Sequence, residues 1–332
     1  MVMSVEDSEL TPLRHSPRAP RARVMAIANQ KGGVGKSTTA VNLGGWLALD
    51  GHRVLIVDLD PQANASTGVG VDPRRAPATV YDVLVDDRQV EDAIEPTAIK
   101  GLFCLPSNID LAGAEIEMVP MLSREMRLKR ALAPVVEQFD FILIDCPPSL
   151  GLLTVNALVA ASEVLVPIQC EYYALEGVGQ LLKNVQLIRS SLNAGLRLTG
   201  IVLTMYDART KLAEEVESQV RGHFTGRVFR AVIPRSIRLA EAPSFGQPVA
   251  LYDPKSKGAQ AYRRLAMEIL GKPDEDATPA PESRLDTAEP SPPEPHLSSE
   301  PAPSSELPPA VAELPPVYAP HVDGDHEQGG DA

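Results

Sequence analysis

The hydrophobic pattern alternates between short, uninterrupted apolar runs and longer stretches in which apolar residues recur at helical spacing. The short runs predict buried strands at residues 24–28, 53–59, 102–105, 139–145, 164–168 and 199–204. The longer stretches predict helices at residues 38–49, 79–84, 111–119, 123–139 and 174–189. Apolar strands that alternate with helices form a mostly parallel sheet with both faces covered. We therefore expect an α/β fold with a doubly wound, mostly parallel sheet.

A glycine-rich turn joins the first predicted strand to the first predicted helix, and Lys36 and Ser37 follow it. Glycines let the backbone N–H groups turn inward, and a helix N-terminus adds partial positive charge, so this turn favours a bound polyphosphate. In the P-loop pattern the lysine reaches the β- and γ-phosphates and the serine hydroxyl binds Mg²⁺. We predict an ATP site formed by Gly32, Gly33, Val34, Gly35, Lys36, Ser37 and Thr38.

One position departs from that pattern, because Gln30 stands where the first glycine of the P-loop is expected, with a second lysine, Lys31, beside it. An ordinary strand-to-helix connection is the other interpretation of such a turn. The Gly-Lys-Ser sequence after an apolar strand favours nucleotide binding.

Aspartates end two of the predicted strands. Asp58 and Asp60 end the strand at 53–59, and Asp145 ends the strand at 139–145. Ligands bind beyond the carboxyl ends of parallel strands, so these carboxylates are expected near the γ-phosphate. A carboxylate beside a phosphate is costly unless Mg²⁺ or water lies between them. We therefore predict Asp145 and Asp58 as metal ligands, although a polar strand end before a proline turn also explains one aspartate.

Charge and proline divide the chain of 332 residues into three parts. Residues 1–22 lack periodicity and predict a flexible arm, and residues 23–272 hold the α/β pattern. Residues 273–332 contain 14 prolines and fourteen acidic residues against one basic residue, Arg284, and predict a disordered acidic tail. The tail alone accounts for the net charge of −13, so the body is neutral and its charge does not exclude DNA binding.

The cysteines and the apolar runs indicate the cellular compartment in which the protein is expected. Cys104, Cys146 and Cys170 are an odd number without a C-x-x-C pair, which argues against a disulfide framework or a thiolate metal site. No run resembles a signal peptide or a membrane span. We expect a cytoplasmic protein that makes no membrane contact.

Five arginines lie between residues 221 and 238 without an acidic residue among them. Guanidinium groups suit phosphate oxygens, so this stretch predicts DNA contacts that do not depend on sequence. A solvated basic rim is the alternative. Four basic residues in the predicted helix at 123–139 favour a solvated face rather than DNA contact.

Three segments carry a family resemblance over about residues 23–270. Residues 31–37 read KGGVGKS, residues 57–62 read VDLDPQ, and residues 233–249 read IPRSIRLAEAPSFGQPV. The first resembles the deviant Walker A motif of the ParA/MinD class of P-loop ATPases, and all three together resemble the ParA/Soj family of chromosome-partitioning ATPases. Ser37 replaces the usual threonine of the family and keeps its hydroxyl, and Ala63 replaces a usual glycine.

The resemblance implies roles for further residues. It implies that Lys31 reaches across an ATP-bound homodimer to the partner's phosphates, and that Asp60 is needed for hydrolysis, with Lys31 and Lys36 as the other catalytic groups. Aspartate is a weak base at pH 7, so orienting the attacking water is the role we expect for Asp60. Hydrolysis should then be slow without a partner.

The resemblance also implies ligands and partners. It assigns DNA binding to Arg209 and Arg238, and it places Pro234 and Arg235 near the nucleotide base. A ParB-type centromere-binding protein is the implied partner, nonspecific double-stranded DNA the implied track, and nucleoid association the implied location, with chromosome or plasmid partitioning as the function.

Two other functions use a similar fold. A membrane-cycling division-site regulator of MinD type needs a basic amphipathic C-terminal helix, whereas this chain ends in an acidic, proline-rich segment. An iron–sulfur carrier needs paired cysteines, which the sequence lacks.

Overall fold

The computed structural model describes residues 22–171 and 174–273. The chain divides into two units, Met1–Thr278 and Pro279–Ala332, and every described residue belongs to the first. Apart from Ala22 and Pro273, the predicted arm at 1–22 and the predicted tail at 273–332 lie outside the described residues.

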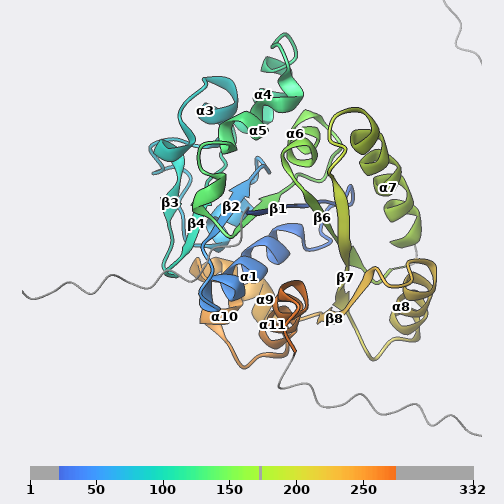
Figure 1. The fold of residues 1–332 in the computed structure, drawn as a ribbon. Coiled ribbons are helices and arrows are strands. Elements are labelled where there is room, and N and C mark those ends of the chain that lie inside the picture. The colour runs from blue at the N-terminus through green and yellow to red at the C-terminus, as the bar shows by residue number, and fades with distance from the viewer. Residues whose placement is uncertain (1–21, 172–173, 274–332) are drawn as a thin grey trace, which may run out of the picture. The chain divides into compact units, whose positions relative to one another are not determined.

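The described residues form one eight-stranded sheet with the strand order β3-β4-β2-β5-β1-β6-β7-β8 (Figure 1). Only the β3–β4 pair is antiparallel, and the other neighbours pair in parallel. The strands are β1 (Arg23–Ile27), β2 (Val54–Asp58), β3 (Glu95–Pro96), β4 (Leu102–Leu105), β5 (Phe141–Asp145), β6 (Glu163–Gln169), β7 (Arg197–Tyr206) and β8 (Val228–Pro234). The predicted doubly wound α/β fold is therefore confirmed.

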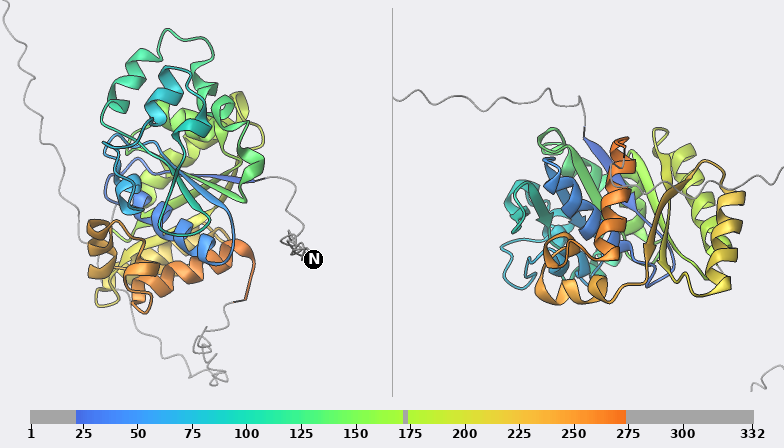
Figure 2. Two further views of the ribbon diagram at one scale, coloured as in Figure 1. Left: turned by 90° about the vertical axis from the view of Figure 1, so that its left-hand side faces the viewer. Right: turned by 90° about the horizontal axis from the view of Figure 1, so that it is seen from below.

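Helices cover both faces of this sheet (Figures 1 and 2). The first group is α1 (Lys36–Leu49), α2 (Asn64–Gly68), α9 (Ile237–Glu241), α10 (Val249–Tyr252) and α11 (Lys257–Leu270). The second group, on the other face, is α3 (Val80–Val85), α4 (Leu111–Glu117), α5 (Arg127–Leu132), α6 (Leu152–Ala160), α7 (Ala174–Ser191) and α8 (Lys211–His223). Short 3₁₀ turns complete the fold as η1 (Val90–Ala93), η2 (Arg124–Met126), η3 (Val136–Gln138) and η4 (Ala242–Phe245).

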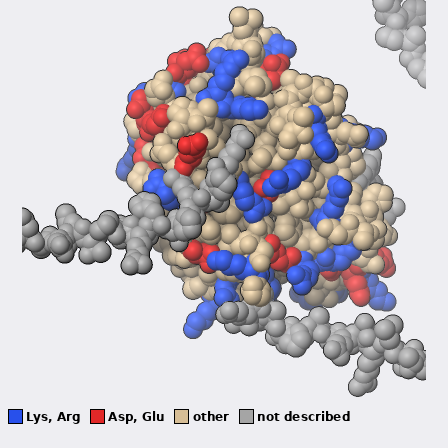
Figure 3. Space-filling model, in the orientation of Figure 1, with Lys and Arg blue, Asp and Glu red and all other residues tan. Residues whose placement is uncertain are grey.

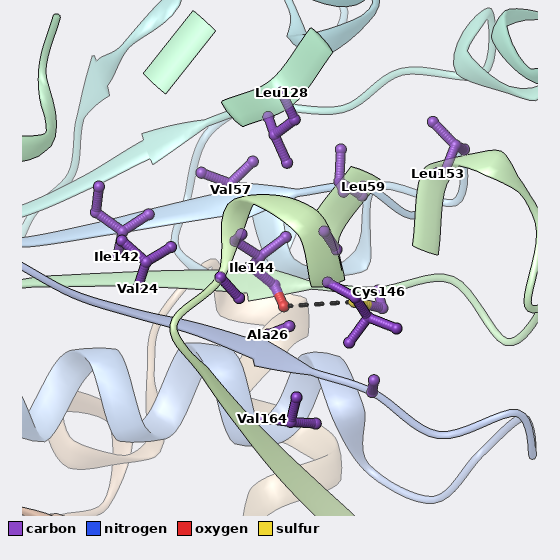
Figure 4. Close-up of a cluster of buried hydrophobic side chains, with 14 of the residues drawn as sticks. Val24, Ala26, Val57, Leu59, Leu128, Ile142, Ile144, Cys146, Leu153 and Val164 are labelled. Atoms are coloured by element: carbon purple, nitrogen blue, oxygen red, sulfur yellow. Dashed lines mark hydrogen bonds between the residues drawn. The ribbon is translucent and has the colours of Figure 1, made fainter. Parts of the chain in front are cut away.

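The strand side chains divide between two cores because successive residues of a strand point to opposite faces. In β1, Val24 and Ala26 pack with the second group of helices, whereas Met25 and Ile27 pack with α1 and its group. Figure 4 shows the first of these cores, in which Val24, Ala26 and Ile144 lie among side chains of the neighbouring strands and helices. Both faces are apolar, which explains why the strands read as uninterrupted runs in the sequence.

The predicted helix at 123–139 needs correction. The structure breaks this segment into η2, α5 and η3. Ser123 adopts a left-handed φ of 51°, and Pro134 lacks the N–H that would continue the helix. Its basic face is also only partly solvated, because the Arg127 side chain is 12% exposed and is bound to Asp87 and to the carbonyl of Leu84.

A buried ion cluster closes the amino-terminal end of the sheet. The Glu163 carboxylate is 1% exposed and accepts two hydrogen bonds from Arg23, at 2.9 and 2.7 Å. Arg197 at 2.8 Å and the Thr199 hydroxyl at 2.7 Å also donate to it. The third donor group of Arg23, Nη1, binds the carbonyl of Ile269 and thereby joins α11 to β1.

Among the described residues, none of the helices combines the length and apolar character needed to cross a bilayer.

Candidate nucleotide site

The phosphate loop between β1 and α1 takes the conformation that its glycines allow. Gly33 and Gly35 have φ values of 76° and 87°, a region that side chains with a Cβ atom disfavour. The Thr204 hydroxyl on β7 fixes the loop by donating to the Val34 carbonyl at 2.8 Å. The Asn29 side chain fixes its start, since it accepts from the Lys31 amide at 3.0 Å and donates to a carbonyl of β6.

A cavity of about 430 Å³ opens against this loop. It brings the predicted phosphate-binding residues, except the buried Val34, together with Asp60, which lies after β2. The lining residues are Gly32, Gly33, Gly35, Lys36, Ser37, Thr38, Val41, Asn42, Asp60, Gln62, Asn64, Gly68, Pro148, Met205, Ala242, Pro243 and Gln247.

Lys36 is the main buried cation of this cavity. It is 6% exposed, and its Nζ donates to the carbonyl of Lys31 at 3.3 Å. Burial lowers the pKa of Lys36, while the nearby Asp145, Cys146 and Asp60 oppose that shift. A buried ammonium that lines an open cavity is suited to binding an anionic ligand such as a triphosphate.

Asp145 is the buried anion beside it. The side chain is fully buried, and neither carboxyl oxygen has a hydrogen-bond partner in the part of the chain that the structure describes. Burial and the charge of Asp58 raise the pKa of Asp145, while the Ser37 side chain and Lys36 oppose the shift. Buried charges without partners are expensive, so this orphaned carboxylate fits a divalent cation held jointly with Ser37.

Asp58 lies next to Asp145 in the β2–β5 register, but its oxygens already have protein donors. They accept from the amide and hydroxyl of Ser66, at 2.8 and 2.7 Å, and from the Asp60 amide at 3.1 Å. Burial raises the pKa of Asp58 to about 6, opposed by the bonds from Ser66 and the Asp60 amide. In the structure Asp58 fixes the segment after Asp60, and its role as a metal ligand stays a prediction.

Asp60 is 8% exposed, and it accepts a hydrogen bond from the Gln62 amide at 3.0 Å. Ala63, which follows in the same loop, has a left-handed φ of 53°. A glycine would adopt this conformation without strain, so the alanine stiffens the loop.

Lys31 is separated from the other charged residues of the loop. Its ammonium pairs with Glu171 at the end of β6, and both side chains are 48% exposed. Lys31 does not line the described nucleotide cavity of its own protomer.

Pro234 and Arg235 line a second cavity of about 240 Å³. Gly35, Thr38 and Met205 line both cavities, so the second adjoins the phosphate loop. Its position beside the phosphate loop agrees with a site for the nucleotide base.

The two predicted DNA-binding arginines are accessible, and each is paired with carboxylates. Arg209 is 87% exposed and donates to both oxygens of Asp207, at 2.8 and 2.7 Å. Arg238 is 53% exposed and pairs with Glu241 at 2.9 Å and with Asp253 at 3.3 Å. On the face of the molecule that Figure 3 shows, basic side chains are interspersed with acidic ones.

Sequence reasoning missed several lining residues. Met205, with a φ of 51°, lines both cavities, and Ala242, Pro243 and Gln247 line the first. These residues carry no charge, so composition offered no signal. The resemblance at 233–249 covers Ala242, Pro243 and Gln247 but gave these three residues no role. Burial raises the pKa of the Cys146 thiol, which disfavours the reactive thiolate form. The thiol donates only a long contact to the Ile144 carbonyl (Figure 4).

Comparisons with known proteins identify the family. A family model described as an AAA domain matches residues 22–198. The sporulation initiation inhibitor protein Soj of Bacillus subtilis is 55% identical over 247 residues, which are 74% of this chain and 98% of that protein. The chromosome partitioning protein ParA of Caulobacter vibrioides is 52% identical over 252 residues, with 75% and 94% covered. This chain belongs to the ParA/Soj family of partitioning ATPases.

Solved structures agree with that membership. Cobyrinic acid a,c-diamide synthase from Mycobacterium smegmatis, with bound ADP and magnesium, has a TM-score of 0.66 at 43% identity and covers 75% of this chain and 94% of its own. The septum site-determining protein MinD of Pyrococcus horikoshii, complexed with Mg-ADP, has a TM-score of 0.61 at 32% identity, with 75% and 96% covered. The predicted ParA/Soj-type ATPase, with ATP and Mg²⁺ as cofactors, is thereby confirmed.

Proposed function

We propose that this ParA/Soj-family ATPase is an ATP-dependent dimerising switch that binds DNA nonspecifically and partitions a chromosome or plasmid together with a ParB-type partner. The observation that carries the proposal is the placement of Lys31. Lys36, Ser37 and Asp60 line their own cavity, whereas Lys31 is half exposed and outside it. A lysine so placed can reach the phosphates of a second protomer.

The nucleotide site supplies binding and orientation. Ser37 and Asp145 would hold Mg²⁺, which neutralises the charge that develops on the phosphates. Lys36 binds the β- and γ-phosphates, and the loop amides of residues 32–35 orient them. Asp60 orients the attacking water, and Pro234 and Arg235 border the base.

The DNA site follows from dimerisation. Arg209 and Arg238 are exposed, and two protomers double these contacts. If a dimer neutralises about six phosphates, DNA affinity scales as about the −5.4 power of salt and falls on the order of a thousandfold between about 50 and 200 mM. A single protomer binds weakly, so hydrolysis releases DNA and gives a nucleoid-associated cycle in the cytoplasm.

DNA co-sedimentation with ATP, ADP or no nucleotide tests this function. We expect DNA to pellet the protein with ATP only, with the steep salt dependence given above. Equal pelleting under all three conditions would contradict the switch. Liposome pelleting in parallel tests the MinD-type alternative, for which ATP-dependent lipid binding would be required.

The Arg238→Ala variant tests the DNA face. We expect ATP-dependent DNA affinity to fall and the magnitude of the salt slope to drop by about 1 to 2, because each dimer loses two arginines. Arg74→Ala is the matched control, since Arg74 is also exposed and paired with a carboxylate, Asp72. The assignment fails if both variants bind as the wild type does.

A further inference from the structure

Two glycines that are far apart in the sequence touch through their backbones. Gly70 and Gly246 both have left-handed φ values, 82° and 62°. A Cβ atom on Gly70 would lie 2.8 Å from the Gly246 carbonyl oxygen, and one on Gly246 would lie 2.9 Å from the Gly70 Cα. These neighbours are backbone atoms, which no side-chain rotation can move. The two segments are therefore in rigid contact.

Gly70 ends the segment that carries the hydrolytic aspartate, residues 60–70, which we call the hydrolytic segment. Asp60 lies in the nucleotide cavity at one end of it. Ser66 is held by Asp58, and Gly68 packs so closely on α1 that a Cβ atom would lie 2.9 Å from Val41. A change in the position of Asp60 must therefore be taken up within a short and closely packed stretch.

Gly246 belongs to the segment that carries a DNA-binding arginine, residues 237–247, which we call the Arg238 segment. Arg238 lies in α9, and Ala242, Pro243 and Gln247 of the same segment line the nucleotide cavity. Beyond its end, the Val249 amide donates to the buried Asn42 side chain of α1 at 2.7 Å. Helix α10, which follows this segment, packs beside α1 (Figure 1).

We propose that the Gly70–Gly246 contact is the joint that couples the hydrolytic segment to the Arg238 segment, so that Arg238 is presented to DNA only when the hydrolytic segment is in its ATP position. The inference rests on the proposed function and specifies how its two sites communicate. Packed interiors transmit small displacements rather than absorbing them, and a backbone-to-backbone contact has no side chain to yield. Coupling between sites is reciprocal, so DNA binding also stabilises the ATP position of the hydrolytic segment.

The test uses Gly70→Ala and Gly246→Ala, with Gly271→Ala as the matched control. Gly271 has a similar φ of 68°, but a Cβ atom there would meet nothing within 4 Å. The control thus carries the same backbone strain without the steric contact. The measurement is the ratio of DNA dissociation constants in ADP and in a non-hydrolysable ATP analogue, together with analogue affinity and melting temperature.

We expect the ratio to fall about tenfold or more in both joint variants, with analogue affinity near that of the control, and to stay at the wild-type value in Gly271→Ala. If both joint variants keep the ratio of the wild-type protein, the proposed coupling through the Gly70–Gly246 contact is wrong. A ratio of one in the wild type would instead overturn the proposed function, so the two failures are distinguishable.

Hydrogen exchange of the wild-type protein provides a second test that no folding defect can obscure. We expect the amides of residues 61–70 and 237–247 to gain protection together when the ATP analogue is added. Gain of protection at 61–70 with no change at 237–247 would contradict the joint.

Discussion

Asp145 and Glu163 are buried carboxylates at opposite ends of the sheet, on the parallel strands β5 and β6, and they differ in their partners. Asp145 is the last residue of the otherwise apolar strand β5, and its carboxyl oxygens have no hydrogen-bond partner among the described residues. Glu163 begins β6 and is bound by two arginines and a threonine. A buried charge with partners stabilises the fold, whereas one without partners is tolerated when a ligand completes it. The comparison separates the functional end of the sheet from the structural end.

The Asp145→Asn variant should produce the largest effect. We expect ATP turnover to fall by about a hundredfold or more, because the metal loses its carboxylate ligand. The free energy of unfolding without Mg²⁺ should stay level or rise, since the cost of ionising a buried carboxyl group whose pKa is raised is removed. Steady-state phosphate release and urea unfolding measure the two quantities. Normal turnover in this variant would contradict the assignment of Asp145 as a metal ligand.

Asp60→Ala tests the other acidic residue at the functional end. We expect turnover to fall by about a hundredfold as the attacking water loses its orientation, while ATP and DNA binding persist. Nucleotide binding, DNA binding and phosphate release are measured on the same preparation. A variant that hydrolyses ATP at the wild-type rate would contradict the assignment.

Glu163→Gln should show the reverse pattern. We expect a loss of about 2 kcal/mol in the free energy of unfolding, below the usual cost of breaking a buried pair because Arg23 and Arg197 are partly exposed. ATP turnover at a temperature where both proteins are folded should be unchanged. The exposed Glu137→Gln serves as the control in urea unfolding. Lost turnover with unchanged stability would contradict the assignment of Glu163 to the structural end of the sheet.

The pH dependence of stability gives the smallest effect. Burial acts to raise the pKa of Glu163, but the bonds from Arg23 and Thr199 and the charges of Arg23 and Arg197 lower it below its ordinary value of 4.5. Its stabilisation is therefore complete above that pH and is lost as pH falls through the lower folded pKa. The difference in unfolding free energy between the wild type and Glu163→Gln should therefore shrink as pH falls below 4.5. A constant difference would show that this carboxylate does not titrate as described.

The same contrast explains which features the sequence could predict. Asp145 was predictable because it ends an apolar strand in a chain with a phosphate loop, which is a local pattern. The Glu163 cluster was not, because Arg23, Arg197 and Thr199 come from strands distant in the sequence. Asp58 has the same local pattern as Asp145, and only the fold brings Ser66 to its oxygens.

Boundaries and weak elements were harder to predict than the strands. The helix predicted at 123–139 has the apolar spacing of one helix, but Pro134 and the left-handed Ser123 divide it. β8 was predicted only as part of a basic stretch, because Arg230 interrupts its apolar residues and Arg227 and Arg235 flank this edge strand. The contact of Gly70 with Gly246 has no local signature, since it depends on tertiary packing.

The central claim is that bound ATP joins two protomers and that only the pair holds DNA. Sedimentation velocity of Asp60→Ala with a short DNA duplex tests it most directly, because this variant keeps ATP unhydrolysed. We predict protein dimers on the duplex with ATP and free monomers with ADP, and we predict that Lys31→Ala in the same background abolishes the dimer. Monomers that bind the duplex equally well without nucleotide would contradict the account.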